Sequence, residues 1–321
     1  MKRALITGIS GQDGSYLTEF LLKKGYEVYG TTRTLNHSSS HLFRLSDVLS
    51  DITLLEANMS DTESINAAVR EAMPDEVYNL GAQSSIASSW NHSIATAETT
   101  AIGTLRLLEA IRVHVPDARY YQASSSDMFG ISPPPQNEET PFHPRSPYGV
   151  SKAFAYWMTV SFRESYKMFA ANGILFNHES PRRGLEYLTR KVTDGVAQII
   201  ARKKEKLQLG NLESVRDWGF AGDYVQAMWM MLQVDIPDDF IIATGEAHSV
   251  REFVEKAFAR VDLDYQDYVV VDPALLRPAE TSSLLGDPAK AKHCLGWNPC
   301  VSFDELVAMM VDADLKRYDL M

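Results

Sequence analysis

Cysteine is almost absent from this 321-residue chain, which contains only Cys294 and Cys300. Two cysteines cannot build the disulfide framework of a small secreted protein, so we expect free thiols in a reducing compartment and a cytoplasmic location. Long apolar runs are also missing. No window approaches 18 apolar residues without a charge, so no transmembrane helix is expected. The apolar run near the N-terminus is too short for a signal peptide.

Positive charge is in short supply as well. The chain has 31 Lys and Arg against 42 Asp and Glu, which gives a formal net charge of −11. This balance argues against a nucleic acid or an anionic membrane as partner. An anionic ligand would need a local cluster of basic side chains. Apolar residues at 45% and charged residues at 23% are typical of a globular protein and exclude disorder. We expect no metal site.

What the sequence does contain is a regular alternation of short apolar strands with helices of helical apolar spacing. We expect strands over Arg3–Thr7, Glu27–Gly30, Ile52–Leu55, Glu76–Leu80, Arg119–Ala123 and Gly173–Phe176, and helices over Ser15–Lys24, Asp61–Met73, Ile102–Val113 and Tyr148–Tyr166. The alternation predicts an α/β fold with a doubly wound parallel Rossmann sheet that binds ligands at the carboxyl ends of its strands. After residue 180 it gives way to loops rich in Arg, Gly and Pro, which predict a smaller, irregular C-terminal substrate domain.

A glycine-rich loop lies between the first expected strand and the first expected helix. Gly8, Gly11 and Gly14 follow one another at a spacing of three. Glycine allows a tight turn and lets the backbone approach a pyrophosphate, which then rests on the helix N-terminus. The context predicts a dinucleotide site that also includes Ser10, Gln12 and Asp13. The alternative is a turn that binds nothing.

The residue after the second strand bears on the choice of cofactor. NAD enzymes of this fold usually place Asp or Glu there, on the ribose 2′-hydroxyl. Here Arg33 lies 19 residues after Gly14, at about that position. A guanidinium favours a 2′-phosphate and therefore NADP. A solvated surface arginine is the alternative. Asn58 and Met59, after the third strand, are expected to flank the adenine.

Tyr148 and Lys152 form a Tyr-x-x-x-Lys pair on an expected helix. A spacing of four places both side chains on one face. A free tyrosine has a pKa near 10 and is a poor base at neutral pH, but a nearby ammonium stabilises the phenolate and lowers that pKa. The pair therefore predicts a base that removes a proton from a substrate hydroxyl while a hydride leaves the same carbon.

Ser124, Ser125, Ser126 and Asp127 follow the expected strand that ends at Ala123, so they lie at the ligand-binding edge. A serine hydroxyl there is able to bond the reacting hydroxyl of a substrate. A carboxylate two residues later is placed for general-base work on a carbon acid. The alternative is a Ser or Asx turn, which explains the residue types without any chemistry.

With these motifs the chain resembles the extended short-chain dehydrogenases/reductases and, within them, the GDP-mannose 4,6-dehydratase family. The resemblance runs nearly end to end and is carried by GISGQDGSYL, PDEVYNLGAQSS, GTLRLLEAIR, YQASSSDMFG, PFHPRSPYGVSK, GILFNHESPRRG, TRKVT, LGNLESVRDWG and RPAETSSLLGDPAKAKHCLGW. The NHESPRRG stretch is far more specific than the glycine loop.

The resemblance implies a redox cycle on GDP-mannose, or a close GDP-hexose, without net oxidation. Tyr148 takes the 4-hydroxyl proton as hydride passes from C4 to NADP⁺, and the 4-ketone acidifies the C5 hydrogen. A carboxylate removes that hydrogen, the C6 hydroxyl leaves as water, and the hydride returns to C6. The implied catalytic residues are Ser125, Asp127, Tyr148 and Lys152, of which Lys152 also holds the nicotinamide ribose.

The resemblance also implies binding residues and an organisation of the chain. Cofactor contacts are implied for Leu80, Gly81, Ala82, Gln83, His178 and Arg183, and substrate contacts for Ser84, Asn177, Lys191, Leu209, Gly210, Asn211, Arg216, Arg277 and Glu280. The NADP-binding Rossmann domain is expected over residues 1–177 plus about 217–249. The GDP-sugar-binding domain is expected over about 178–216 plus 250–321.

A homodimer or homotetramer is expected from the same resemblance. In similar enzymes the segment 34–48, which contains Arg44, reaches the cofactor of a neighbouring subunit. The long helices that carry Leu105, Leu108, Tyr156 and Trp157 are expected to form the dimer bundle.

Four positions depart from the family pattern. Ser125 replaces a Thr and keeps the hydroxyl, Asn58 replaces an Asp beside the adenine, and Gly81 replaces an Ala. Asp127 replaces the catalytic Glu and is one methylene shorter, while a misplacement of about 1 Å can cost on the order of 10²-fold in rate. Two alternatives therefore stay open: a GDP-hexose C4 epimerase or C4 dehydrogenase without dehydration, and a non-catalytic protein that binds NADP or a nucleotide sugar.

Overall fold

The centre of the molecule is one seven-stranded sheet, seen in a computed structural model that describes residues 1–35, 40–275 and 283–321. Its strands all run parallel to their neighbours. In spatial order they are β11 (Asp239–Ile242), β6 (Ala170–Leu175), β5 (Arg119–Ser125), β4 (Glu76–Asn79), β1 (Arg3–Thr7), β2 (Glu27–Thr32) and β3 (Ile52–Glu56). The prediction of a doubly wound parallel sheet is confirmed.

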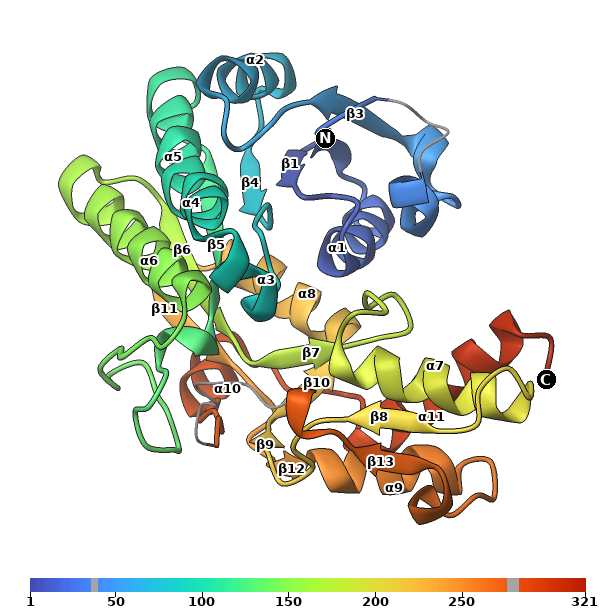
Figure 1. Cartoon of the computed structure of the whole chain (residues 1–321). Helices are drawn as coiled ribbons and strands as arrows, with labels where there is room; N and C mark the ends of the chain where they lie inside the picture. Colours follow the sequence, from blue (N-terminus) through green and yellow to red (C-terminus); the bar gives the residue numbers. More distant parts are fainter. Residues whose placement is uncertain (36–39, 276–282) are drawn as a thin grey trace.

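Helices cover both faces of this sheet (Figure 1). One face packs against α1 (Gln12–Lys23), α8 (Ala221–Met231) and α10 (Ala289–Leu295), and the other against α2 (Thr62–Ala72), α5 (Gly103–His114) and α6 (Pro147–Tyr166). Leu17 and Leu21 lie on the buried side of α1 and contribute to the first core with Met228 of α8. Ile65 of α2 and Leu107 of α5 belong to the core on the other face.

The register brings the functional ends of the strands to one edge. Thr7, at the end of β1, is paired with Thr31 of β2 and Asn79 of β4. On the other side of the sheet, Ser125 of β5 is paired with Leu175 of β6. Loops that follow these residues therefore meet along the carboxyl edge, where an α/β sheet binds its ligands.

Some boundaries differ from those expected. The strand expected to end at Ala123 continues to Ser125, because β6 supplies hydrogen-bonding partners for two more residues. The helix expected from Ile102 begins as α5 at Gly103 and follows a π-helical turn, η3 (Ala97–Ile102). The strand expected over Gly173–Phe176 is β6, which begins earlier, at Ala170.

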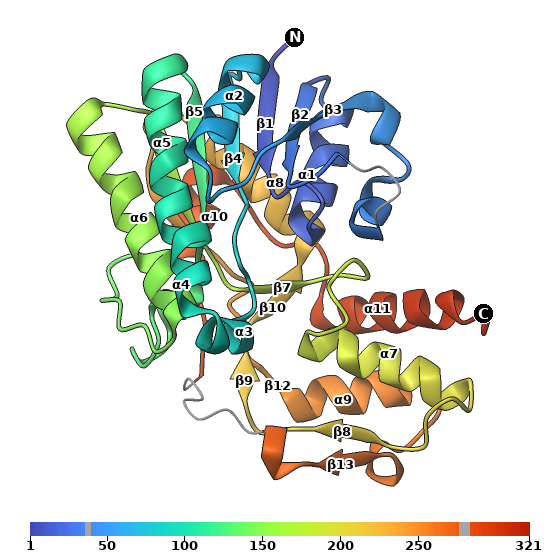
Figure 2. The same cartoon turned by 45° about the horizontal axis from the view of Figure 1, so that its top comes forward.

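A second group of elements lies below the carboxyl edge (Figure 2). It comprises β7 (Asn177–Glu179), β10 (Trp218–Phe220), β8 (Leu207–Leu209), β13 (Val269–Val271), β9 (Val215–Arg216), β12 (His248–Ser249), α7 (Leu188–Ile200), α9 (Val250–Ala259) and α11 (Phe303–Arg317). Its strands pair only in twos, and a separate apolar core joins Val196 of α7, Phe253 of α9 and Met310 of α11. This is the smaller, irregular part predicted from the sequence, although the domain boundaries given above stay a prediction.

Short helical segments complete the chain. They are η1 (Ser40–Leu45), η2 (Leu49–Asp51), α3 (Ile86–Asn91), α4 (Ser93–Thr96), η4 (Ser126–Met128), η5 (Tyr265–Asp267) and η6 (Pro273–Leu275). Cys294 and Cys300 are free and exposed, as predicted. Among the helices of the described residues, none has the length and apolar character needed to cross a membrane.

Candidate active site

A cavity of about 430 Å³ opens between the carboxyl edge of the sheet and the second group of elements. Its walls contain most of the residues predicted to meet the substrate and the reactive end of the cofactor. These are Asp13, Leu80, Ala82, Ser84, Ser125, Asp127, Tyr148, Lys152, Asn177, His178, Arg183, Lys191, Leu209, Gly210, Asn211 and Arg216. Segments that are far apart in the sequence therefore meet in one cavity, although the roles of the individual residues remain predictions.

Other predicted residues lie outside the lining of this cavity. They are Gly8, Ser10, Gly11, Gln12, Gly14, Arg33, Asn58, Met59, Gly81 and Gln83. All of them were assigned to the cofactor, and the glycine loop leads up to Asp13 in the cavity wall. Two residues predicted for the substrate, Arg277 and Glu280, lie outside the described residues.

The glycine loop has the geometry that a phosphate needs. Gly8 has a φ of +68°, and a Cβ atom there would lie 3.0 Å from the Cα of Gly81. The loop and the end of β4 therefore approach each other more closely than side chains allow. Helix α1 begins after Gly11, which provides no side-chain cap for its first amides. Uncapped amides at a helix N-terminus are suited to an anion such as a pyrophosphate.

Asp13, at the start of α1, is paired with His178 of β7. The His178 Nε2 lies 2.9 Å from the Asp13 carboxylate, and its Nδ1 lies 2.8 Å from the carbonyl oxygen of Phe176. Burial raises the pKa of Asp13, but the charge and hydrogen bond of His178 outweigh it and lower the pKa to about 2. Burial lowers the pKa of His178, and Asp13 more than reverses this, so that its pKa lies above the usual value. The pair links the glycine loop to the start of the second group.

This pair makes a testable contribution to stability. The low pKa of Asp13 stabilises the fold above pH 3.8, the usual pKa of an aspartate, and this stabilisation is lost as the pH falls toward about 2. The raised pKa of His178 stabilises the fold below pH 6.5, and this stabilisation is lost as the pH rises through the pKa that His178 has in the folded protein. We therefore expect Asp13→Asn to lower the free energy of unfolding most between pH 3.8 and 6.5, by about 1.5–3 kcal/mol.

Urea unfolding at several pH values measures this difference. The exposed Asp235 is a matched control, because Asp235→Asn removes a carboxylate of the same kind far from His178. A loss in Asp13→Asn that is the same at every pH would show that the charges of the pair do not produce it.

Arg33 and Arg44, the two arginines that the sequence analysis connected with a cofactor after the second strand, lie in different environments. Arg33 is exposed one residue beyond β2, a position that fits both a 2′-phosphate contact and a solvated side chain. Arg44, in η1, donates from Nε to the carbonyl of Arg182 at 2.6 Å and from Nη1 to that of Ser10 at 3.3 Å. It therefore packs on the glycine loop of its own chain. Residues 36–39 of the segment expected to reach a neighbouring subunit lie outside the described residues.

Ser125 and Asp127 form a compact pair at the end of β5. The Ser125 hydroxyl accepts a hydrogen bond from the Asp127 amide at 3.2 Å and donates to its carboxylate at 3.3 Å. The first contact is the serine turn that was considered as an alternative. The turn does not remove the chemistry, because it holds a hydroxyl and a carboxylate together in the cavity wall.

Tyr148 and Lys152 lie one turn apart on α6, and both are buried. The Lys152 Nζ donates to the carbonyl of Ala123 at 2.6 Å and lies 5.8 Å from the centre of the Tyr148 ring. Burial lowers the pKa of Lys152 to about 8. Burial and the nearby Asp127 carboxylate raise the pKa of Tyr148. Burial and Asp127 therefore shift the pKa of Tyr148 in the direction opposite to the one predicted from Lys152.

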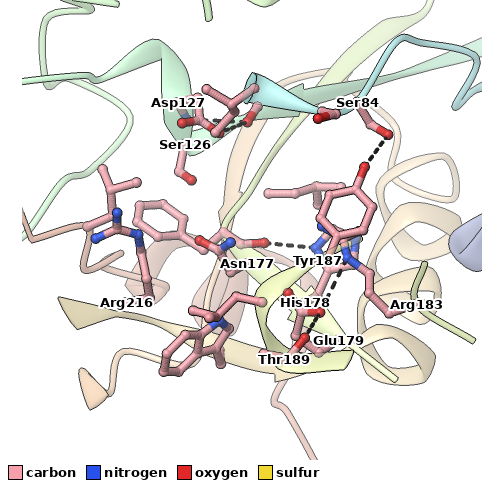
Figure 3. A pocket seen from close by; sticks show the side chains of 18 of the residues that line it. Ser84, Ser126, Asp127, Asn177, His178, Glu179, Arg183, Tyr187, Thr189 and Arg216 are labelled. Atoms are coloured by element: carbon pink, nitrogen blue, oxygen red, sulfur yellow. Dashed lines mark hydrogen bonds and ion pairs between the residues drawn. The ribbon is translucent and has the colours of Figure 1, made fainter. Parts of the chain in front are cut away.

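The cavity also contains residues that the sequence analysis missed, notably Glu179, Tyr187 and Thr189 (Figure 3). Glu179 is buried; it accepts a hydrogen bond from Thr189 Oγ1 at 2.6 Å and lies 3.3 Å from Arg183 Nε. The available signal was a carboxylate at the end of a short strand, inside a stretch already singled out for His178 and Arg183. Tyr187 and Thr189 have no comparable signal, because their partners are distant in sequence or revealed only by packing.

Two buried polar atoms near the cavity have no hydrogen-bond partner among the described residues. They are the Oε1 of Gln83 and the Nε of Arg183, of which the second still forms the ion pair with Glu179 described above. Both side chains were assigned to the cofactor from the sequence. A buried polar atom is costly when unpaired, so the Oε1 of Gln83 is suited to a polar ligand.

Comparisons with known proteins identify the family of the chain. Residues 5–310 match the family described as GDP-mannose 4,6 dehydratase. The chain is 53% identical to GDP-mannose 4,6 dehydratase 2 of Arabidopsis thaliana, over 98% of this chain and 87% of the relative. It is 47% identical to the GDP-mannose 4,6 dehydratase of Homo sapiens, over 98% and 91% respectively.

Solved structures support the fold. A dTDP-glucose 4,6-dehydratase of Streptomyces venezuelae superposes with a TM-score of 0.87 at 22% identity and covers 99% of this chain and 98% of its own. A UDP-glucose 4-epimerase of Thermus thermophilus gives 0.83 at 26% identity, with 97% and 98% covered. On the family match and the relatives near half identity, the chain belongs to the GDP-mannose 4,6-dehydratase family.

Proposed function

We propose that this protein is an NADP-dependent dehydratase that converts GDP-mannose to GDP-4-keto-6-deoxymannose. The observation that carries the proposal is the arrangement of one cavity wall, in which the pair Tyr148 and Lys152 faces the same space as the pair Ser125 and Asp127. The first pair suits proton transfer at a hydroxyl, and the second adds a carboxylate for a carbon acid. Dehydration requires both.

The residues around the glycine loop fit a dinucleotide. The uncapped N-terminus of α1 suits the pyrophosphate, and the buried Oε1 of Gln83, which has no hydrogen-bond partner among the described residues, suits one of its polar groups. Lys152, whose Nζ reaches the end of β5, would hold the ribose next to the reacting sugar. When bound, the nicotinamide supplies the acceptor and then the donor of the hydride.

The side chains divide the proton transfers between them. Tyr148 removes the proton of the 4-hydroxyl, while Ser125 hydrogen-bonds the same oxygen. The 4-ketone then acidifies the hydrogen at C5, and Asp127 removes this proton and gives it to the C6 hydroxyl, which leaves as water. Burial and the nearby Asp127 carboxylate raise the pKa of Tyr148, which opposes formation of its phenolate.

The far end of the cavity suits the GDP group. Lys191 and Arg216 line it together with the loop residues Gly210 and Asn211. Burial, together with the nearby Lys204, lowers the pKa of Lys191. A negative charge beside Lys191 is therefore favoured, and a diphosphate provides one. In a chain with a net charge of −11, such a local group of cations points to an anionic ligand.

Incubation of the NADP-loaded protein with GDP-mannose tests the proposal directly. The product is expected to have lost the mass of one water molecule. The alternative C4 epimerase or C4 dehydrogenase is favoured by one observation, the short carboxylate of Asp127, and it predicts a product that keeps its oxygen atoms. A non-catalytic binding protein would return the nucleotide sugar unchanged.

The preference for NADP can be tested at Arg33. We expect Arg33→Ala to weaken NADP binding by about 1.5–3 kcal/mol, because a charge-assisted contact to the 2′-phosphate is lost. NAD binding should stay the same. Calorimetric titration measures both affinities, and Arg70→Ala, at another exposed arginine, serves as the control. Equal affinity of the unmutated protein for NAD and NADP would contradict the assignment.

We also propose that the protein is a homodimer or homotetramer in the cytoplasm. Leu108 and Tyr156, on helices expected to form the dimer, are buried within the chain, so they do not mark a free surface. Trp157, which was also predicted for this interface, is 57% exposed, and Trp90 of α3 and Ile94 of α4, on helices that contact α6, are 56% and 81% exposed. Light scattering gives the mass in solution.

A further inference from the structure

A hydrogen bond across the cavity joins two parts of the chain that are 103 residues apart in sequence. Ser84 belongs to the loop after β4, and Tyr187 directly precedes α7. Their hydroxyl oxygens lie 2.7 Å apart, and both residues line the cavity. Figure 3 shows the Tyr187 ring directed toward Ser84, on the opposite side of the view from Arg216. Nothing in the sequence motifs assigned a role to Tyr187.

The ring of Tyr187 is held in place by charged neighbours. The guanidinium carbon of Arg183 lies 3.8 Å from the ring centre, in a cation–π contact. Arg183 is in turn 3.3 Å from the carboxylate of the buried Glu179. The buried Arg190 donates to the Arg183 carbonyl at 2.8 Å and is paired with Asp314 of α11. The phenol hydroxyl therefore has a defined position and does not sweep freely through the cavity.

The chemistry of this pair suits a sugar more than a phosphate. Ser84 and Tyr187 are both uncharged, and each hydroxyl is able to donate and to accept. Arg216, one of the cations suited to a diphosphate, lines the opposite side of the cavity view from Tyr187 (Figure 3). Tyr187 also contributes to the raised pKa of Tyr148, after the larger effects of burial and Asp127, which puts it within electrostatic reach of the reaction centre.

We propose that Tyr187 is a hexose-binding residue whose hydroxyl, together with that of Ser84, hydrogen-bonds a hydroxyl of the sugar ring. The inference rests on the proposed function, since it takes a GDP-hexose as the ligand. The Ser84–Tyr187 hydrogen bond supplies each group with a partner before the sugar binds. A ring hydroxyl then joins or replaces this bond, and the two residues hold the sugar against the wall that contains Tyr148 and Asp127.

The experiment compares two ligands, GDP-mannose and GDP, of which only the first carries a mannosyl group on the β-phosphate. Affinities for GDP-mannose and for GDP are measured by calorimetry on the NADP-loaded protein, in a Tyr148→Phe background so that the sugar is not turned over. Tyr187→Phe keeps the ring and its contact with Arg183 but removes the hydroxyl. We expect GDP-mannose to bind about 3- to 10-fold more weakly, as for one neutral hydrogen bond, and GDP to bind with unchanged affinity.

Ser84→Ala provides a second variant at an exposed position that packs no core. It should weaken the binding of GDP-mannose by a similar factor. The affinity lost in the double variant should be smaller than the product of the two single factors. Equal weakening of GDP and GDP-mannose by Tyr187→Phe, or no weakening of either, would overturn the inference. The binding comparison does not depend on turnover, so it stays separate from the failure of the proposed function, which is a protein that leaves GDP-mannose unconverted.

Discussion

Tyr148→Phe is expected to lower the turnover of GDP-mannose by about 10²- to 10⁴-fold, the contribution typical of a general base. The substitution removes one hydroxyl from a buried ring and leaves its shape unchanged. The first hydride transfer depends on removal of the 4-hydroxyl proton, and every later step needs the 4-ketone that it forms, so the whole cycle slows. Binding of GDP-mannose should change little, because the contacts to the GDP group lie elsewhere in the cavity. Single-turnover kinetics measures the chemical step apart from product release.

Tyr166 offers a matched control for this variant. It is a tyrosine at the other end of the same helix α6, with 52% of its surface exposed. Tyr166→Phe should therefore leave the rate of turnover unchanged. If Tyr148→Phe retained the activity of the unmutated protein, the assignment of Tyr148 as the base would be wrong, and another group would have to remove the 4-hydroxyl proton.

Asp127→Asn is expected to separate oxidation from dehydration. Tyr148 and Lys152 are left intact, so oxidation at C4 should still take place. Without a base at C5, loss of water should fall by about 10²- to 10⁴-fold. Reduced cofactor should then accumulate and absorb in the near ultraviolet. An Asp127→Asn protein that still releases water at the normal rate would show that another group removes the C5 hydrogen.

Asp127→Glu tests the geometry of the same residue. The Asp127 carboxylate accepts a hydrogen bond from the Ser125 hydroxyl at 3.3 Å. If the backbone here is that of the family, the added methylene is neutral or helpful. If the site is adapted to the shorter acid, a displacement of about 1 Å is expected to cost on the order of 10²-fold in turnover. The rate of water loss in this variant distinguishes the two cases.

The parts of the fold that could be predicted are those set by local sequence. Apolar runs identified the strands, and helical spacing identified the helices, because both patterns reflect burial along a single element. The end of β5 was missed because Ser124 and Ser125 join the strand only through pairing with β6. The π-helical turn at Ala97–Ile102 was missed for a similar reason, since sequence spacing predicts an ordinary helix over such a segment.

The candidate site divides in the same way. Tyr148 and Lys152 are four residues apart on one helix, so their proximity follows from helix geometry. The direction in which the pKa of Tyr148 is shifted does not, because it depends on burial and on Asp127 from another element. Tyr187 was not predicted because its partner, Ser84, is 103 residues away. Contacts of that kind are decided by the packing of the second group of elements against the sheet.

The central claim is that the hydride removed from C4 returns to C6 of the same sugar while C5 exchanges its hydrogen with solvent. Incubation of GDP-mannose that carries deuterium at C4 tests it most directly, with the product analysed by NMR and a parallel reaction run in deuterium oxide. The account predicts deuterium from C4 at C6 of a 4-keto-6-deoxy product, and solvent deuterium at C5. Deuterium that stays at C4 of an epimer or of unchanged GDP-mannose, with none entering C5 from solvent, would contradict it.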